Sequence, residues 1–511
     1  MRIDRLEIKS PWKNLQGLVV NFDEREPITA IIGRNGAAKS NLLEALISIF
    51  SNIVLREHAS FAYTIQYAIK NHHVVITAEA AKTPKASVDG LVISFEELRE
   101  QWTPHFVVGY YSGTSDRFQR LFEPHDLQAR DAGKAAPEKA RAPERTLSLR
   151  RFTYARPEHG LFSLLSFYYR IDPKVGNFLH RTLRIIGFDS TLITVHKPSW
   201  GNEDVDDFWG ATGAVRHLLE ILRDHALAPF HRKVRVKTDF ASKGTLTEMW
   251  HLFLPDVKSL ASVAARYGDD PTSLFQALDS MRLSKLLRDF RVHVKVEGAR
   301  GAIHTRQMSE GEQQLLTVLG LMRFTRQESS LYLLDEPDTH LNPAWEVDYL
   351  NMLRHVAQID SNSHTIIATH DPLLVAGLRR EQICVMIRSK DGKITASHPE
   401  TSPRGRGIAA VLTSPLYGLE SQLDNFSLRV LKKIYELSFD ENKTRRSRNL
   451  ARLRRLVPGV EPDESSPDPY RNIARLAYRL VRTFPIDDPD RKNEVVEALA
   501  KQLYHQAKEE S

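Results

Sequence analysis

Three short stretches of the sequence carry the residue types and spacing that chemistry on a phosphate group needs. The first, Gly33 to Ser40, reads GRNGAAKS and follows the apolar residues 28–32. In a glycine-bearing loop that joins a strand to a helix, backbone N–H groups and the positive helix end bind anionic oxygens. A lysine and a hydroxyl at the end of such a loop reach the β- and γ-phosphates and a Mg²⁺ ion. The stretch therefore predicts a phosphate-binding loop, with Lys39 on the phosphates and Ser40 on the metal.

One position in this loop departs from the usual pattern G-x-x-x-x-G-K-[ST]. Ala38 stands where the pattern has glycine, immediately before Lys39. The extra methyl group is harmless if Ala38 has a helical φ, but it crowds the nucleotide if φ must be positive. The sequence leaves both alternatives open.

The second stretch, residues 305–314 (TRQMSEGEQQ), precedes an apolar helical pattern. Ser309, followed three residues later by Glu312, predicts a capping box, which is a purely structural role. The exposed N–H groups from Ser309 to Gly311 also form an anion site at the positive end of a helix. Both roles are compatible with the sequence.

The third stretch is an apolar run, residues 330–334, that ends in Asp335 and Glu336. A buried strand with paired carboxylates at its carboxyl end places one carboxylate on Mg²⁺ and the next where it activates water. Another apolar strand, residues 364–368, ends at His370. These positions are candidates for catalysis.

The elements that must position these residues follow from the spacing of the apolar side chains. A strand over residues 106–111 opens into a polar loop with Arg117, which is expected either to meet phosphate or a partner, or to form a structural ion pair. The apolar positions show no sustained heptad pattern, so we expect no long coiled-coil arm. Further helices are expected over residues 161–169, 215–227, 257–267 and 271–287, and further strands over residues 234–240, 249–254 and 290–296.

The composition limits the class of protein. With 511 residues, two or three domains are expected. The single Cys384 rules out a disulfide framework, and no apolar run reaches membrane-spanning length, so we expect a cytoplasmic protein without membrane contact. The net charge of +7 permits a nucleic-acid partner without requiring one. The densest basic cluster, residues 443–455, predicts a solvated helix face or a contact with phosphate or an acidic partner.

In this order, the motifs resemble the ATPase heads of the ABC superfamily, and within it the SMC/RecF/OLD-like branch. The loop at residues 33–40 resembles the Walker A motif, Ser309-Glu-Gly-Glu-Gln the signature motif, residues 331–336 the Walker B strand, and residues 338–342 the D-loop. The string FVVGYYSGTSDR at residues 106–117 and TSPLYGLES at residues 413–421 are similar to the PtuA-type ATPases of Septu antiphage systems, including those attached to retrons.

The resemblance implies an α/β fold, an ABC-type P-loop ATPase head with an inserted α/β lobe and a helical C-terminal region. Its expected parts are a first ATPase lobe at residues 1–125, a flexible linker at 126–150, the inserted lobe at 151–300, a second ATPase lobe at 301–401 and a partner-docking region at 402–511. It also implies that Ser40 and Asp335 hold Mg²⁺, that Glu336 polarises the attacking water and that His370 senses the γ-phosphate. The residues implied to bind ATP are Gly33, Arg34, Asn35, Gly36, Ala37, Ala38, Lys39, Ser40, Asn41, Ser309, Gly311 and Glu312.

The resemblance implies that such heads close as head-to-head dimers around ATP, and it allows a larger oligomer. The implied function is a nucleotide-gated ATPase that regulates or positions a separate HNH nuclease subunit (PtuB-like), with nucleic acid or a retron reverse transcriptase and its RNA–DNA as further partners. Ala38 suggests slow hydrolysis. The alternative is a RecF-like DNA-repair ATPase that binds DNA directly. A transporter subunit is disfavoured by the inserted lobe, and a stand-alone nuclease by the lack of a metal-binding pattern after Ile383.

Overall fold

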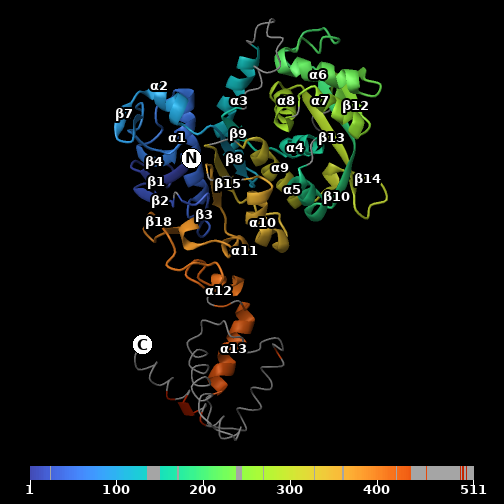
Figure 1. Ribbon diagram of the computed structural model, residues 1–511. Coiled ribbons are helices and arrows are strands. Elements are labelled where there is room, and N and C mark those ends of the chain that lie inside the picture. Colours follow the sequence, from blue (N-terminus) through green and yellow to red (C-terminus); the bar gives the residue numbers. More distant parts are fainter. Residues whose placement is uncertain are drawn as a thin grey trace. The chain divides into compact units, whose positions relative to one another are not determined.

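The computed structural model describes residues 1–438 except 24, 135–149, 170–171, 237–243, 269, 327–328, 359–361, 420 and 422, together with residues 456, 495, 498, 499 and 502. The chain divides into two compact units, Met1–Ser402 and Pro403–Ser511. The first unit contains three β-sheets with helices between and around them (Figure 1). The prediction of an α/β protein is therefore confirmed.

A seven-stranded sheet carries the predicted motifs, in the order β18-β17-β3-β16-β15-β8-β9. All neighbours pair in parallel except β18, which is antiparallel to β17. The three central strands are buried along their whole length, which explains their continuous apolar runs. Because the carboxyl ends of parallel strands meet at one edge, the loops after β3, β15 and β16 lie together. The strands are β3 Ile28–Ile32, β8 Val107–Tyr111, β9 Phe152–Tyr154, β15 Leu331–Asp335, β16 His364–Ala368, β17 Ile383–Arg388 and β18 Ile394–Ser397.

Helix α1 (Lys39–Leu55) is buried on nearly every side because it lies between two sheets. The second sheet is antiparallel, with the order β2-β1-β4-β5-β6-β7. Phe50 of α1 packs edge-on against Tyr67 of β4, with 5.7 Å between ring centroids, and α1 also contacts β15 and β16. The strands of this sheet are β1 Arg2–Ile8, β2 Leu18–Asn21, β4 Tyr63–Ile69, β5 His72–Ala78, β6 Lys85–Val88 and β7 Leu91–Ile93.

A third, five-stranded antiparallel sheet has the order β11-β12-β10-β13-β14. Its central strand β10 (Ile185–His196) was missed by the sequence analysis, because Gly187, Asp189 and register shifts interrupt the alternation of apolar residues. The other strands are β11 Phe230–Val236, β12 Thr245–Leu254, β13 Leu287–Val296 and β14 Ala302–His304, and the accompanying helices are α6 Gly213–His225, α7 Val257–Ala265 and α8 Pro271–Leu283. The remaining short helical segments of the first unit are α2 Phe95–Glu97, α5 Pro173–Asn177, α11 Pro372–Val375 and the segments Leu98–Trp102, Phe178–Thr182, Thr305–Gln307 and Arg380–Gln382.

Two helices pack closely beside the predicted signature segment. Helix α4 (Pro157–Tyr169) lies along α9 (Glu310–Phe324), and both can be followed in Figure 1. Glycines allow this approach: a Cβ atom at Gly160 would press on Thr317, and one at Gly320 would collide with the Ser163 side chain. The position of α9 therefore depends on α4.

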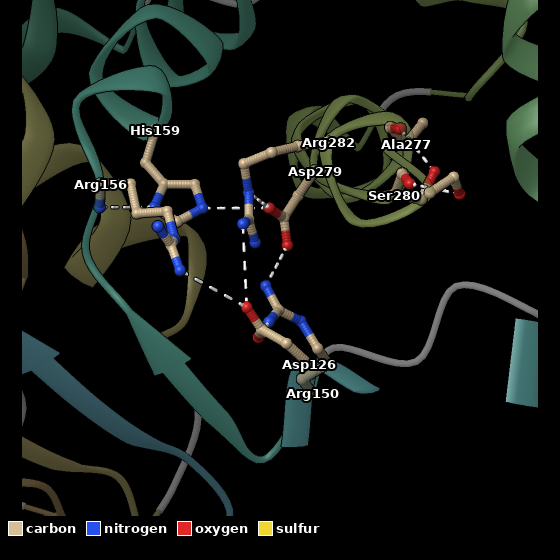
Figure 2. Close-up of polar contacts among 9 residues, drawn as sticks. Asp126, Arg150, Arg156, His159, Ala277, Asp279, Ser280 and Arg282 are labelled. Carbon is tan, nitrogen blue, oxygen red and sulfur yellow. Dashed lines mark hydrogen bonds and ion pairs between the residues drawn. The ribbon is translucent and has the colours of Figure 1, made fainter. Parts of the chain in front are cut away.

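A buried group of charges fixes α4 to its neighbours (Figure 2). Asp279 of α8 accepts hydrogen bonds from Arg150 (2.5 Å), His159 of α4 (3.0 Å) and Arg282 (2.8 Å). His159 Nδ1 accepts from the backbone N–H of Arg156 at 3.0 Å, so its proton lies on Nε2. The cationic partners hold the pKa of Asp279 well below its usual range despite the opposing effect of burial. The carboxylate is therefore charged and fully partnered.

Two predicted boundaries differ from the structure. The flexible linker at 126–150 is wrong for its first part, since α3 runs over Gln119–Lys134; residues 135–149 lie outside the described residues. His125 stacks on Phe152 with 4.0 Å between ring centroids, so the helix is held by tertiary contacts that its polar composition does not reveal. The inserted lobe was expected to begin at residue 151, but β9 pairs with β8 as the last strand of the seven-stranded sheet.

The remaining described helices are α10 (Pro343–His355) of the first unit, and α12 (Ile408–Leu412) and α13 (Asn425–Ser438) of the second unit. The basic cluster at residues 443–455 lies outside the described residues, so the predictions for it stay predictions. Within the described part of the chain, every helix is too short or too polar to cross a bilayer.

Candidate functional site

The loop between β3 and α1 has the conformation of an anion-binding loop. Gly36 has φ 82° and Ala38 has φ 66° and ψ 25°, so both residues lie in the left-handed region. Of the two alternatives for Ala38, the positive φ is therefore the one found. No side chain caps the first turn of α1, so its N–H groups face the loop. Lys39 Nζ donates to the carbonyl oxygen of Gly33 at 2.8 Å, which folds the lysine over the loop.

Asp335 ends β15 directly beside this loop. The Ser40 hydroxyl hydrogen-bonds its carboxylate, while the second oxygen, Oδ2, is buried and has no hydrogen-bond partner among the described residues. Burial raises the pKa of Asp335 to about 6, and Glu336 adds to the rise, while Ser40, Arg117 and Lys39 oppose it. A buried carboxylate oxygen without a donor, next to a hydroxyl, fits a hard divalent cation such as Mg²⁺, which typically takes one or two protein oxygens and completes its shell with phosphate and water. The described residues contain no group of three carboxylate, histidine or cysteine ligands that would form an all-protein metal site.

Glu336 and His370, the two predicted catalytic residues, are in contact. His370 Nδ1 lies 3.0 Å from Glu336 Oε1. The backbone of Glu336 has φ 50°, which is rare for a residue with a Cβ atom, and its N–H donates to the carbonyl of Ala368 at 2.8 Å. The structure thus uses a strained backbone to turn the Glu336 carboxylate toward the loop after β16.

Asp338 and Thr369 add a second buried pair that the sequence analysis did not assign to the site. Thr369 Oγ1 donates to Asp338 Oδ2 at 2.5 Å, while Asp338 Oδ1 has no partner among the described residues. Burial raises the pKa of Asp338 to about 6. Burial also lowers the pKa of Lys39, against the opposing influence of Glu336, Asp335 and Asp338. One lysine therefore faces three carboxylates.

The predicted signature residues form the capping box expected from sequence. Glu312 Oε2 accepts from the Ser309 N–H at 2.7 Å and from the Ser309 hydroxyl at 2.9 Å, while the Glu312 N–H donates to Ser309 Oγ at 3.3 Å. Gly311 packs against the carbonyl of His340, where a Cβ atom would collide. Among the described residues, no hydrogen bond joins Ser309, Gly311 or Glu312 to the loop at 33–41 of the same chain.

The other predicted binding residues have different surroundings. Arg34, Asn35 and Gly36 are exposed, whereas Ala37 is buried. Asn41 donates to Asn14 Oδ1 at 2.5 Å and accepts from Arg117.

Glu44, buried on α1, pairs with both Lys13 and Arg117. Of the two roles considered for Arg117, the structural ion pair is therefore the one found. The signal for Glu44 in the sequence is a lone carboxylate inside an apolar helical run.

Comparison with known proteins agrees with these motifs. Residues 197–376 match the family model described as "AAA domain, putative AbiEii toxin, Type IV TA system" (AAA_21), a segment that includes Ser309, Asp335 and His370. The Septu protein PtuA of Bacillus mycoides (strain KBAB4) is 21% identical over 185 residues, which are 34% of this chain and 26% of that protein. Residues 197–376 therefore carry an AAA_21 domain, and the chain is a distant homologue of PtuA.

The chain aligns with only about a quarter of the length of that curated relative. Solved structures with a similar arrangement include the SMC head domain from Thermotoga maritima, 12% identical with a TM-score of 0.33, where the match covers 78% of this chain and 100% of that chain. The recombination mediator protein RecF matches at 14% identity with a TM-score of 0.28, over 77% of this chain and 97% of that chain.

Proposed function

We propose that this chain binds and hydrolyses ATP as a subunit of an antiphage defence complex. The observation that carries the proposal is the edge of the seven-stranded sheet, where Lys39, Ser40, Asp335, Glu336 and His370 converge and Asp335 Oδ2 has no partner among the described residues. An anion-binding loop beside a buried carboxylate with a free oxygen suits a nucleoside triphosphate with its metal ion.

The residues would act as follows. Lys39 would leave the Gly33 carbonyl and donate to the β- and γ-phosphates. Ser40 and Asp335 hold Mg²⁺, which neutralises phosphate charge when bound. Glu336 orients the attacking water and accepts its proton, and His370 couples the position of Glu336 to the γ-phosphate.

A second copy of the chain would complete the site. At the N-terminus of α9 the Ser309 N–H donates to Glu312, while the N–H groups of Glu310 and Gly311 lie at the positive end of the helix, where anions bind. In a head-to-head dimer they would meet the γ-phosphate held by the partner. ATP would then favour the closed dimer by its differential affinity, and hydrolysis would reopen it.

The distant homology to PtuA supports a defence role, with a separate HNH nuclease (PtuB-like) as the regulated partner. A retron reverse transcriptase with its RNA–DNA, and a larger oligomer, are further proposals of the same kind. Turnover is expected to be slow, because Ala38 places a methyl group at a left-handed position of the phosphate loop.

The test is steady-state ATPase activity combined with measurement of mass in solution. Glu336→Gln should abolish turnover and yield a dimer that depends on ATP and Mg²⁺, because binding is retained without hydrolysis. Lys39→Ala should prevent both. Asp348→Asn, an exposed carboxylate on α10, is the matched control and should change neither. A Glu336→Gln protein that stays monomeric with ATP would refute the head-dimer proposal, and unaltered turnover would refute the assigned site.

A further inference from the structure

One face of the five-stranded sheet packs against helices, and the opposite face carries charged and aromatic side chains. Side chains alternate between the faces of a strand. Leu252 of β12 and Phe290 and Val292 of β13 point to the buried side. Residues on the opposite side include Arg232 of β11 and Arg291 of β13, which are exposed. We call this opposite side the open face.

The open face is rich in cations. It carries Arg232, Arg291 and Lys295, and Arg306 reaches it from the segment after β14. Asp289 accepts from Arg291 Nε at 2.6 Å and from Arg306 Nη2 at 2.8 Å, so one carboxylate is shared by two arginines. Arg291 and Arg306 therefore share one carboxylate, and Arg232 and Lys295 add two further cations to this face. The arginine side chains keep exposed fractions of 49% for Arg291 and 67% for Arg306, so they remain accessible to a ligand.

Aromatic rings are placed among these charges. Phe230 of β11 is 50% exposed and stacks on His251 of β12, with 4.8 Å between ring centroids and 22° between planes. The guanidinium of Arg232 lies 5.8 Å from the centroid of the Phe230 ring. Arg232 Nε donates to His251 Nε2 at 3.2 Å, so His251 Nδ1 carries the proton and donates to Thr194 at 3.2 Å. This network holds a flat aromatic surface beside a fixed guanidinium.

Burial and nearby positive charge together lower the pKa of two histidines of the open face. Burial lowers the pKa of His251, and Arg232 and Arg291 lower it further. Burial likewise lowers the pKa of His304 on β14, together with His293, Arg306 and Arg291. Both histidines thus lie near the arginines of the open face, whose charge lowers their pKa in addition to the larger effect of burial.

We propose that the open face binds single-stranded nucleic acid, with backbone phosphates on Arg232 and Arg291 and a base stacked on Phe230. A half-exposed aromatic ring beside guanidinium groups is the combination by which proteins hold unpaired strands without reading sequence. An acidic protein would satisfy the charges but would not need the exposed ring. The proposal goes beyond ATP hydrolysis and does not require nucleotide. Its surface ends at Arg306, three residues before Ser309, next to the signature segment.

The test is fluorescence anisotropy of a labelled oligo(dT) strand with the full-length protein, without ATP, over a series of salt concentrations. Arg232→Ala with Arg291→Ala should weaken binding at least about tenfold at low salt and reduce the slope of log affinity against log salt by about 1.4, which is two phosphate contacts on a single strand. The matched control is Lys233→Ala with Arg235→Ala. It removes the same charge from β11 at two exposed positions that alternate to the other side of the sheet.

Phe230→Ala should weaken oligo(dT) binding roughly fivefold or more while leaving the salt slope unchanged, since it removes stacking and no charge. Thermal unfolding of each variant confirms that the fold is retained, and Arg232→Lys with Arg291→Lys should restore the slope. Equal affinities for the Arg232/Arg291 variant and its control would overturn the proposal. So would competition by polyglutamate as strong as by unlabelled oligo(dT) together with no effect of Phe230→Ala, a result that would assign the face to an acidic protein.

Discussion

Replacing Asp335 by asparagine should stabilise the ligand-free protein while removing its response to Mg·ATP. Burial raises the pKa of this carboxyl from its usual 3.8 to about 6, which means that the folded state disfavours the charged form. A shift of about 2 pH units corresponds to about 3 kcal/mol of lost stability at pH 7.5, where the carboxylate is charged in both states. The neutral asparagine avoids this cost.

The stability gained by Asp335→Asn should increase with pH. Below pH 3.8 Asp335 is protonated in the folded and the unfolded state, so it costs nothing there. As the pH rises the cost grows, and it is complete above pH 6. The stability gained by Asp335→Asn should therefore be about 3 kcal/mol at pH 7.5 and about half of that at pH 5.

The assay is urea unfolding of protein treated with EDTA, followed by tryptophan fluorescence. All six tryptophans precede residue 402, so the signal reports on the first unit alone. Mg·ATP should then stabilise the unaltered protein and leave Asp335→Asn unaffected. Asp348→Asn serves as the control, since this exposed carboxylate should show neither effect. The reasoning fails if Asp335→Asn is no more stable than the unaltered protein at pH 7.5, or if the difference does not shrink at pH 5.

Three further predictions test other parts of the site. Ala38→Gly should raise ATPase turnover and change the free energy of unfolding by no more than about 1 kcal/mol, because relief of left-handed strain is offset by the entropy of glycine; unchanged turnover in a steady-state assay would contradict it. Gly311→Val should abolish ATPase activity but spare equilibrium binding of a fluorescent ATP analogue, since the new side chain collides with His340 rather than with the phosphate loop; loss of binding would count against this. Asp279→Asn should destabilise the first unit by about 3–5 kcal/mol in urea, because it leaves Arg150 buried with a weakened partner; a loss under 1 kcal/mol would show that the network is dispensable.

Much of the candidate site could be predicted because its signals are local. The loop at residues 33–40, the Ser309–Glu312 capping box and the carboxylates after β15 each depend on residues a few positions apart, and each was found where the sequence placed it. Central strands buried on both sides also read clearly as apolar runs. By contrast, β10 was missed because bulges break the alternation of its apolar residues. Part of α3 was taken for a linker because the tertiary contacts that hold this polar helix cannot be read from its sequence.

The sequence by itself determined which residue types were available for phosphate chemistry and in which short motifs they stand. Only the tertiary structure decided that Ala38 has a positive φ, that Glu336 meets His370, and that His159, Asp279 and Arg150 form one buried network. The physical reason is that a turn or a cap is stabilised by neighbours along the chain. A strand order, a strained φ or a buried ion pair is stabilised by segments far apart in the sequence that meet only when the whole unit packs.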